Sequence, residues 1–314
     1  MGVTVILLLV GFFLLVKGAD FFVDGASSLA RYLRIPSVIV GLTIVAFGTS
    51  APELSVSISA AMQGSNEIAV SNVLGSNIFN LLVVSGCCAA ISTIPITKSL
   101  IRKELPFSIM AAVLLVPFAF LGAQNMTIAR TEGLILLALF VFYILWQVVD
   151  AMKSRKESQE DPMEKIISPF RSIVLIILGC IMIVAGGNLV VNSATDIAHA
   201  FGLSETLIGL TIVAIGTSLP ELVTSIVASR KGENDLSLGN VVGSNIFNVL
   251  MILGISTSIH PIRLEPTFIF DTVFLVAASL IILLFAHTKG KISRKEGLIM
   301  LALYIVYDVY IIMR

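Results

Sequence analysis

The chain has 314 residues, of which 57% are hydrophobic and 13% are charged, and its formal net charge is zero. A soluble chain carries roughly 25% charged residues, so the composition excludes an ordinary soluble domain and predicts a membrane protein. The neutral charge balance gives no indication of a nucleic-acid partner. The three cysteines have no metal-binding spacing and form no disulfide framework, so buried thiols are predicted.

Ten apolar segments are long enough to cross a bilayer, which takes about 20 residues of helix. In chain order they cover residues 2–24, 36–62, 67–92, 104–122, 129–151, 170–192, 206–229, 236–258, 266–286 and 295–313. The first segment lacks the basic leader of a signal peptide, and its small residues recur in the sixth, so it is read as part of the fold. The only long polar stretch separates five segments from five. This division predicts a first unit at residues 1–151, a linker loop at 152–169 and a second unit at 170–314.

Residues 41–86 recur 168 positions later as residues 209–254, without a gap and with 27 of the 46 positions identical. Both copies contain GLTIVA, then GTS-x-PEL, and then GSNIFN about two dozen residues later. Each copy places a glutamate, Glu53 or Glu221, inside a long apolar run. An ionisable residue in such a position is costly and by default marks an ion or substrate site. The duplication therefore predicts one site built from both halves of the chain.

The distribution of basic residues predicts how the chain crosses the membrane. Sixteen lysines and arginines fall in one set of alternate loops, and only Arg130, Arg263 and Arg314 fall in the other. Cytoplasmic loops carry the excess of basic residues, so both termini are predicted to be extracytoplasmic and the central loop cytoplasmic. The two copies are offset by five segments, an odd number, and must cross in opposite directions. The predicted fold is all-α: a polytopic membrane protein of ten transmembrane helices, arranged as two inverted five-helix repeats.

The segment that carries Glu53 is predicted to be broken. Pro52 has no N–H to offer the carbonyl of Gly48, four residues earlier, and its ring clashes with that carbonyl. Carbonyls freed between residues 46 and 49 then join nearby hydroxyl and carboxylate oxygens, and the same pattern recurs around Glu221. Hard cations such as Ca²⁺ take six to eight oxygen ligands, and this motif offers oxygen and no soft ligand. Broken helices at the interface of inverted repeats are where transporters of this kind hold their substrates.

The helix that follows each glutamate segment adds a polar stripe. The stripe has a spacing of four residues, which places its members on one face of a helix. Its members are Asn72, Ser76 and Asn80 in the first copy and Asn240, Ser244 and Asn248 in the second. Gly75 and Gly243 are predicted to let neighbouring backbones approach closely. Four helices should thus direct oxygen atoms at one centre.

The charge of this centre constrains the mechanism. Two carboxylates at low dielectric require about two positive charges, which one Ca²⁺, two or more Na⁺ or two protons can supply. An empty site leaves both anions uncompensated, at a cost of several kcal/mol or more. We therefore hypothesise that reorientation requires a filled site, which makes exchange obligatory.

The paired GTS-x-PEL and GSNIFN motifs, the ten apolar segments and the polar loop after the fifth resemble the calcium/cation antiporter superfamily. The closest resemblance is to the Na⁺/Ca²⁺ exchangers of archaea and bacteria, and it covers essentially the whole chain. It implies electrogenic exchange of Na⁺ for Ca²⁺ across the cell membrane by alternating access, with no cofactor and no enzymatic activity. The ion ligands that it implies are Ala46 (carbonyl), Thr49, Ser50, Glu53, Ser76, Asn80, Ala214 (carbonyl), Thr217, Ser218, Glu221, Ser244 and Asn248.

Three alternatives to Na⁺/Ca²⁺ exchange remain open at this point. Asn248 replaces an aspartate that some members carry, the K⁺-dependent branch among them, so it argues against K⁺ cotransport and leaves two acidic ligands. The hydroxyls of the motif suit Na⁺, but a proton/Ca²⁺ antiporter could use the same two glutamates. An intramembrane hydrolase is disfavoured because every histidine lies in a polar connection. A channel is disfavoured because one chain supplies both halves of the site.

The expected partners are inorganic cations, Ca²⁺ and Na⁺, and the lipid bilayer. The chain is expected to be a monomer.

Overall fold

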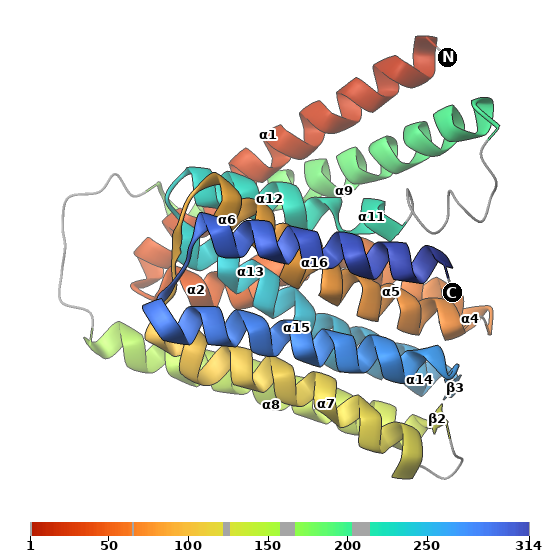
Figure 1. The fold of residues 1–314 in the computed structure, drawn as a ribbon. Coiled ribbons are helices and arrows are strands. Elements are labelled where there is room, and N and C mark those ends of the chain that lie inside the picture. The colour runs from red at the N-terminus through yellow and green to blue at the C-terminus, as the bar shows by residue number, and fades with distance from the viewer. Residues whose placement is uncertain (1, 65, 122–125, 158–166, 203–213, 314) are drawn as a thin grey trace.

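The structure is a computed structural model that describes residues 2–64, 66–121, 126–157, 167–202 and 214–313. Most of these residues are helical, as Figure 1 shows. The α-helices are α1 (Gly2–Leu33), α2 (Ser37–Val40), α3 (Ala46–Thr49), α4 (Ala51–Met62), α5 (Asn66–Phe79), α6 (Ser85–Ile91), α7 (Leu105–Leu121), α8 (Arg130–Glu157), α9 (Pro169–Ala200), α11 (Ala214–Thr217), α12 (Leu219–Arg230), α13 (Asn234–Phe247), α14 (Leu253–Ile259), α15 (Thr267–Lys289) and α16 (Arg294–Met313). Four π-helical segments join them: η1 (Gly41–Val45), η2 (Asn80–Val84), η3 (Leu100–Glu104) and η5 (Asn248–Ile252).

Within the described ranges, eight helices are long and apolar enough to cross a membrane, and one bent pair brings the number to nine. The bent pair is Ser37–Thr49 with Ala51–Met62, which meet at 50°. The bend lies where Pro52 was predicted to break the helix, and Pro52 stands in the first turn of α4, where its missing N–H costs nothing. The predicted segment 206–229 begins outside the described residues, and its described part is interrupted in the same way at Ser218.

Helices α1 and α9 continue beyond the predicted ends of their segments at residues 24 and 192, to Leu33 and Ala200. Ion pairs stabilise α1 at its C-terminal end: Arg31 Nη1, in the extension, lies 2.8 Å from Glu233 Oε1, and two acids near residue 24 pair with Lys231. Lys231 Nζ lies 2.7 Å from Asp24 Oδ1 and 2.9 Å from Asp20 Oδ1. Burial lowers the pKa of Lys231, but the hydrogen bonds to these two carboxylates outweigh it, and the net pKa is above its ordinary value. The apolar segment therefore underestimates the length of α1, because ion pairs stabilise the helix beyond the end of that segment.

Close glycine contacts hold α1 and α9 side by side, and the pair stands apart from the remaining bundle in Figure 1. A Cβ atom added at Gly186 would lie 2.7 Å from the backbone nitrogen of Leu15 and 2.8 Å from the carbonyl oxygen of Gly11. One added at Gly179 would lie 2.6 Å from the backbone nitrogen of Phe22. Only glycine fits at these separations, so the small residues shared by the first and sixth segments set the distance between the two backbones.

The structure adds four two-residue strands to the all-α fold that was predicted. β1 (Ile94–Pro95) pairs antiparallel with β4 (Lys291–Ile292), and β2 (Thr127–Ile128) pairs with β3 (Ile262–Arg263). Each pair joins a loop of the first predicted unit to a loop of the second. These pairings give backbone N–H and C=O groups of the loops partners that the helices cannot supply. Apolar periodicity over whole helices could not indicate such short strands.

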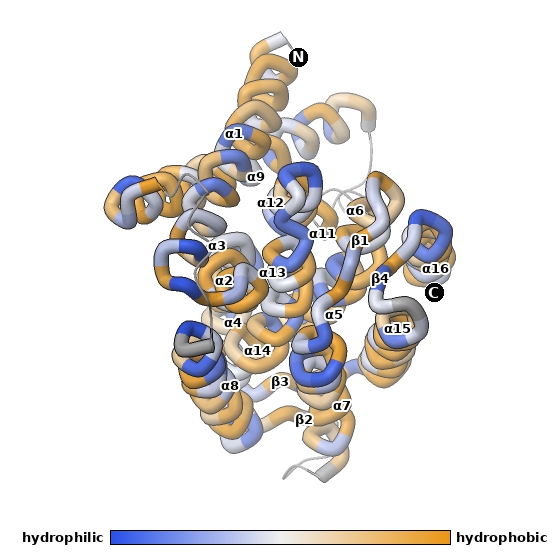
Figure 2. The backbone as a smooth tube through the Cα atoms, turned by 90° about the vertical axis from the view of Figure 1, so that its left-hand side faces the viewer, coloured by the Kyte–Doolittle hydropathy of each residue, from blue (hydrophilic) through white to orange (hydrophobic). Residues whose placement is uncertain are grey.

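The centre of the bundle is α13, in which every residue from Leu236 to Phe247 is buried. The marked N- and C-termini lie on the same side of the bundle in Figure 1. Figure 2 looks onto the side opposite to these ends, where hydrophilic segments gather around β1 and β4. The polar residues of α13 are enclosed by protein, so their hydrogen-bonding groups need partners inside the bundle.

Candidate cation site

The two glutamates of the repeated motif both lie at the starts of helices in the protein interior. Glu53 is in the first turn of α4 and Glu221 is in the first turn of α12, and each is 0% exposed. The positive end of the helix dipole favours a negative charge in this position. The break before each helix, at Ser50 and Ser218, is what creates a helix end at this depth.

Hydrogen bonds bring the two glutamates together from the two halves of the chain. Ser50 Oγ donates to Glu221 Oε1 at 2.9 Å, and Ser218 Oγ donates to Glu53 Oε1 at 3.1 Å. Each carboxylate is thus bonded by the serine that precedes the other carboxylate's helix. Four of the predicted site residues therefore form two buried pairs across the halves, although 171 and 165 positions of sequence separate the bonded partners.

Helices α5 and α13 contribute the serines of their polar stripes to the same cluster. Ser76 Oγ lies 3.4 Å from Glu53 Oε1, and Ser244 Oγ lies 3.4 Å from Glu221 Oε1. Ser76 Oγ is also 3.1 Å from Ser218 Oγ. The six predicted residues therefore form two hydrogen-bonded sets of three, each with members from both halves: Glu53, Ser76 and Ser218 in one, and Glu221, Ser244 and Ser50 in the other.

Two asparagines that the sequence analysis did not single out organise the next residues of the stripe. Asn77 Nδ2 donates to the carbonyl of Asn245 at 3.2 Å, and Asn245 Nδ2 donates to the carbonyl of Asn77 at 3.1 Å. Their side-chain oxygens accept in turn from the amides of the predicted ligands. Asn80 Nδ2 donates to Asn245 Oδ1 at 3.2 Å, and Asn248 Nδ2 donates to Asn77 Oδ1 at 2.9 Å. These bonds fix which end of each ligand amide is an N–H donor and leave the oxygen available.

Four oxygen atoms of the predicted ligands are buried and accept no hydrogen bond from any described residue. They are Glu53 Oε2, Glu221 Oε2, Asn80 Oδ1 and Asn248 Oδ1. A buried acceptor without a donor is costly and rare in folded proteins, so four in one cluster require an explanation. Two carboxylate and two amide oxygens fit a hard cation such as Ca²⁺ or Na⁺. The described residues contain no group of three or more His, Cys, Asp and Glu side chains, as a transition-metal centre would require.

The threonines of the motif lie beside this cluster. Thr49 Oγ1 lies 3.2 Å from the carbonyl oxygen of Val45 and 3.0 Å from Asn240 Oδ1. Its counterpart Thr217 is the last residue of α11 and is buried. Thr49 thereby places α3 against α13, next to the carboxylates that α4 and α12 supply.

The backbone carbonyls of the motif divide into two groups. Gly48 O has lost its helical donor because Pro52 has none, and it lies 3.6 Å from Cys180 Sγ. Ala46 O accepts the N–H of Ser50 at 3.0 Å and lies 3.4 Å from the hydroxyl of Thr49, so its hydrogen bonds come from the motif itself. Ala214 is the first residue of α11, and its side-chain surroundings fall outside the described part of the chain. The carbonyl that the proline frees is therefore that of Gly48.

The first asparagine of each stripe bonds to the helix that carries the glutamate of the same half. Asn72 Nδ2 lies 3.0 Å from Ser57 Oγ and 3.2 Å from the carbonyl oxygen of Glu53. In the other half, Asn240 Nδ2 donates to Ser225 Oγ at 3.0 Å. These bonds hold α4 against α5 and α12 against α13.

Backbone geometry also distinguishes this region. The π-helical segment η2 begins at Asn80, η5 begins at Asn248 and η1 ends just before Ala46. Such segments are frequent at functional sites, because they re-aim side chains within a helix. Gly243 permits the close approach that was predicted, since a Cβ there would lie 2.7 Å from Leu42 Cα. At Gly75, no described atom lies within 4 Å of the equivalent position.

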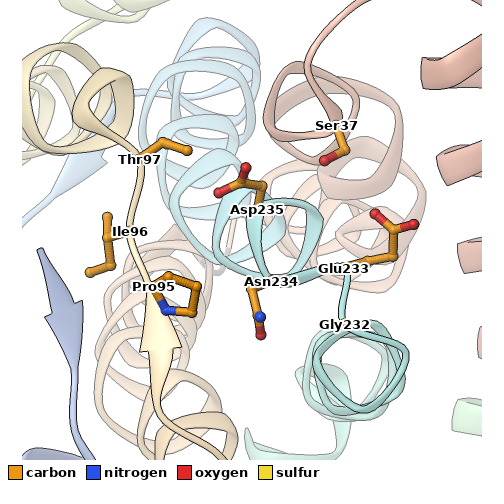
Figure 3. A pocket seen from close by; sticks show the side chains of 8 residues that line it. All are labelled: Ser37, Pro95, Ile96, Thr97, Gly232, Glu233, Asn234 and Asp235. Carbon is orange, nitrogen blue, oxygen red and sulfur yellow. The ribbon is translucent and has the colours of Figure 1, made fainter. Parts of the chain in front are cut away.

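A pocket of about 240 Å³ opens at the N-terminal end of α13 (Figure 3). Its lining includes Glu233 and Asp235, together with Ser37 and Thr97. Glu233 pairs with Arg31 at 2.8 Å. None of the predicted ligands lines this pocket, so it is distinct from the carboxylate cluster.

Comparisons with known proteins agree over nearly the full length of the chain. Residues 3–149 and 171–313 match a family described as sodium/calcium exchanger protein. The chain is 32% identical to the sodium/calcium exchanger MaX1 of Methanosarcina acetivorans, with 97% of each protein covered. It is 36% identical to inner membrane protein YrbG of Escherichia coli, with 83% of this chain and 81% of that protein covered. A structure of the sodium-calcium exchanger NCX_Mj superposes with a TM-score of 0.84 at 33% identity, covering 97% of each chain.

Proposed function

This chain belongs to the sodium/calcium exchanger protein family, and we propose that it exchanges Na⁺ for Ca²⁺ across the cell membrane by alternating access. The family consists of membrane transporters, which are not enzymes and use no cofactor. The observation that carries the proposal is the set of four buried oxygens without donors, on Glu53, Glu221, Asn80 and Asn248. In this proposal these atoms converge on one negative, all-oxygen centre between the two halves of the chain.

In this proposal Ca²⁺ binds to the unpartnered oxygens of the two glutamates and two asparagines. The surrounding hydroxyls and carbonyls complete the six to eight oxygens that Ca²⁺ requires. The proposed ligand set is Ala46 (carbonyl), Thr49, Ser50, Glu53, Ser76, Asn80, Ala214 (carbonyl), Thr217, Ser218, Glu221, Ser244 and Asn248. Na⁺ takes the same kind of oxygen ligand, so the two cations compete for overlapping positions.

Electrostatics gives the reason for coupled exchange. Both glutamates are fully buried, and no lysine, arginine or histidine forms a hydrogen bond or ion pair with them among the described residues. One Ca²⁺, or two or more Na⁺, would compensate their charge, whereas an empty site would leave two anions at low dielectric. The hydrogen bonds from Ser50 and Ser218 link each carboxylate to the opposite half. The two halves therefore reorient only when a cation compensates the charge that they share.

We propose ten transmembrane helices arranged as two inverted five-helix repeats, at residues 1–151 and 170–314, with a cytoplasmic linker at 152–169. Contacts that recur in reciprocal form support this arrangement. β1 of the first unit pairs with β4 of the second, and β3 of the second unit pairs with β2 of the first. Asn77 and Asn245 likewise each donate a hydrogen bond to the carbonyl of the other. Both termini would be extracytoplasmic. In support, the two chain ends lie on one side of the bundle, opposite the hydrophilic face seen in Figure 2.

Transport is proposed to be electrogenic, with more Na⁺ charge than Ca²⁺ charge moving in each cycle. A monomer suffices for this function, because one chain supplies both carboxylates of the site. The number of Na⁺ ions bound in each cycle depends on the negative charge of the ligands. Asn248 contributes a neutral amide, whereas an aspartate at this position would add a third negative charge.

A Na⁺ gradient is expected to drive Ca²⁺ movement without any pH gradient. Proteoliposomes that contain the protein and are loaded with ⁴⁵Ca²⁺ are diluted into Na⁺ or choline medium at one pH. Rapid efflux is expected in Na⁺ and not in choline, because the motif's hydroxyl ligands suit Na⁺. Clamping the voltage with K⁺ and valinomycin should change the initial rate.

The same vesicles distinguish the alternative, a proton/Ca²⁺ antiporter that uses the same glutamates. If only an imposed pH gradient moves Ca²⁺, the assignment of Na⁺ as counter-ion is wrong while the Ca²⁺ site stands. Vesicles that contain the Glu53→Gln variant measure the passive leak.

A further inference from the structure

A second buried carboxylic acid lies outside the candidate cation site. Three of the four π-helical segments in the described ranges adjoin proposed cation ligands, and the fourth, η3, ends at Glu104. Glu104 is 2% exposed, and its neighbours belong to η3, α7 and α8, none of which supplies a proposed cation ligand. A buried ionisable side chain in a membrane segment is costly, so its retention calls for a physical reason.

The surroundings of Glu104 are polar at one point and aromatic elsewhere. Gln147 Nε2, from α8, donates to Glu104 Oε2 at 2.8 Å. Tyr143 also lies on α8, is 0% exposed and stacks on Phe107 with ring centroids 5.0 Å apart. Trp146 packs against both rings. This cluster excludes water and lowers the local dielectric, which disfavours a net charge.

The charged groups near Glu104 are already paired with each other. Lys103 Nζ, from η3, lies 2.7 Å from Asp150 Oδ1, from α8. Their opposite charges therefore largely cancel at Glu104. Helix α15 also packs against η3, and its residue His287 is exposed. Among the described residues, no lysine, arginine or histidine forms an ion pair or hydrogen bond with Glu104.

Two polar atoms of the cluster indicate what is missing. Gln147 Oε1 is buried and accepts no hydrogen bond at contact distance from the described residues, and the Tyr143 hydroxyl lies beside both Gln147 and Glu104. An ionised Glu104 offers only acceptors, so the Tyr143 O–H would be the single donor left for Glu104 and Gln147 Oε1 together. A neutral carboxylic acid adds a second O–H, which allows both groups to be satisfied.

We propose that Glu104 holds a bound proton in the folded transporter, as a neutral carboxylic acid paired with the Gln147 amide. In this pair, Gln147 Nε2 donates to Glu104 Oε2, and the carboxylic O–H donates to Gln147 Oε1 or to the Tyr143 oxygen. The ligand of the site is a single proton, and it is separate from the cations that are exchanged. With this proton bound, Glu104 and Gln147 connect η3 to α8 through an uncharged hydrogen-bonded pair. The neutral carboxyl group can then lie in apolar surroundings.

Infrared spectroscopy of the full-length protein at neutral pH tests the proposal. The parent protein should show the C=O stretching band of a protonated carboxyl, and the Glu104→Gln variant should lack it. The band should therefore appear when the spectrum of the variant is subtracted from that of the parent. Gln147→Leu should shift this band and keep it, because it removes a hydrogen bond and leaves the acid. If Glu104→Gln removes only carboxylate bands, Glu104 is ionised and the proposal is wrong.

Thermal unfolding provides a second readout. Glutamine at residue 104 can form the same paired contact with Gln147, so Glu104→Gln should keep the unfolding midpoint within about 2 °C of the parent. Glu104→Leu, which cannot donate or accept, should lower it clearly. A Glu104→Gln protein that unfolds as easily as Glu104→Leu, or fails to fold, contradicts a neutral acid. Na⁺ could instead raise the unfolding midpoint of the parent and of Glu53→Gln, but not that of Glu104→Gln. That result would show that Glu104 binds a monovalent cation, and the proposal would be wrong.

Discussion

Replacing either Glu53 or Glu221 by glutamine is expected to abolish Ca²⁺ uptake by proteoliposomes preloaded with Na⁺. Each side chain is fully buried and presents one oxygen without a donor. Glutamine keeps the shape but removes one of the two charges that balance Ca²⁺. Removing one partner of a buried charge pair costs about 3–5 kcal/mol. Because about 1.4 kcal/mol corresponds to a factor of ten, the affinity for Ca²⁺ should fall by a hundredfold or more.

Glu104→Gln is the matched control for these two variants. It also replaces a buried glutamate by glutamine, but at a position that contributes no oxygen to the proposed site. It should transport Ca²⁺ at close to the parental rate, and all three variants should elute as one species in size-exclusion chromatography. Near-normal uptake by both Glu53→Gln and Glu221→Gln would remove the electrostatic basis of the proposed exchange.

The second large effect is expected at a residue that is not itself a proposed ligand. Asn77→Leu removes the acceptor that holds the Asn248 amide, at 2.9 Å, and the donor to the carbonyl of Asn245. The Asn248 amide can then turn its N–H towards the cation. Leaving buried polar groups unpaired costs about 1–3 kcal/mol, so the KM for Ca²⁺ should rise roughly tenfold or more while the protein remains folded. Initial rates of ⁴⁵Ca²⁺ uptake over a range of Ca²⁺ concentrations measure this change.

A double-mutant cycle distinguishes positioning from general destabilisation. A carboxylate has two equivalent oxygens and needs no such orientation, so in an Asn248→Asp background the effect of Asn77→Leu should shrink. Asn192→Leu, at an exposed position of α9, controls for the loss of an amide elsewhere. Equal losses in both backgrounds would mean that Asn77 does not orient Asn248.

The sequence alone predicted the helix break and the meeting of the two glutamates. Pro52 in a long apolar segment predicts the break for a steric reason that holds in any surroundings, and the structure confirms a 50° bend there. The repeat then indicates that whatever Glu53 does, Glu221 does as well. The cross-half bonds from Ser50 and Ser218 follow from that symmetry.

The roles of Asn77 and Asn245 could not be deduced in the same way. Each lies one position off the four-residue spacing of the stripe, so helical periodicity places it on another face. Their mutual contact depends on the register between α5 and α13, which a single sequence does not contain. The available signal was their repetition at the same position of GSNIFN in both copies.

Longer-range packing also escaped prediction. Glu104 occurs once, without a counterpart in the repeat, and its burial depends on how η3 lies against α8. The π-helical segments add a residue to a turn without a recognisable pattern of residue types. The extension of α1 to Leu33 is held by the pair of Arg31 with Glu233, a residue 202 positions away along the chain.

The central claim is that the carboxylates of Glu53 and Glu221 share one divalent cation. An experimental structure of the protein crystallised with Sr²⁺ in place of Ca²⁺, with anomalous scattering, tests this claim directly. One anomalous peak is expected within direct bonding distance of an oxygen of each glutamate, and it should disappear when Na⁺ is in large excess. A peak bound to only one of the two glutamates, or one that excess Na⁺ leaves unchanged, would contradict the claim.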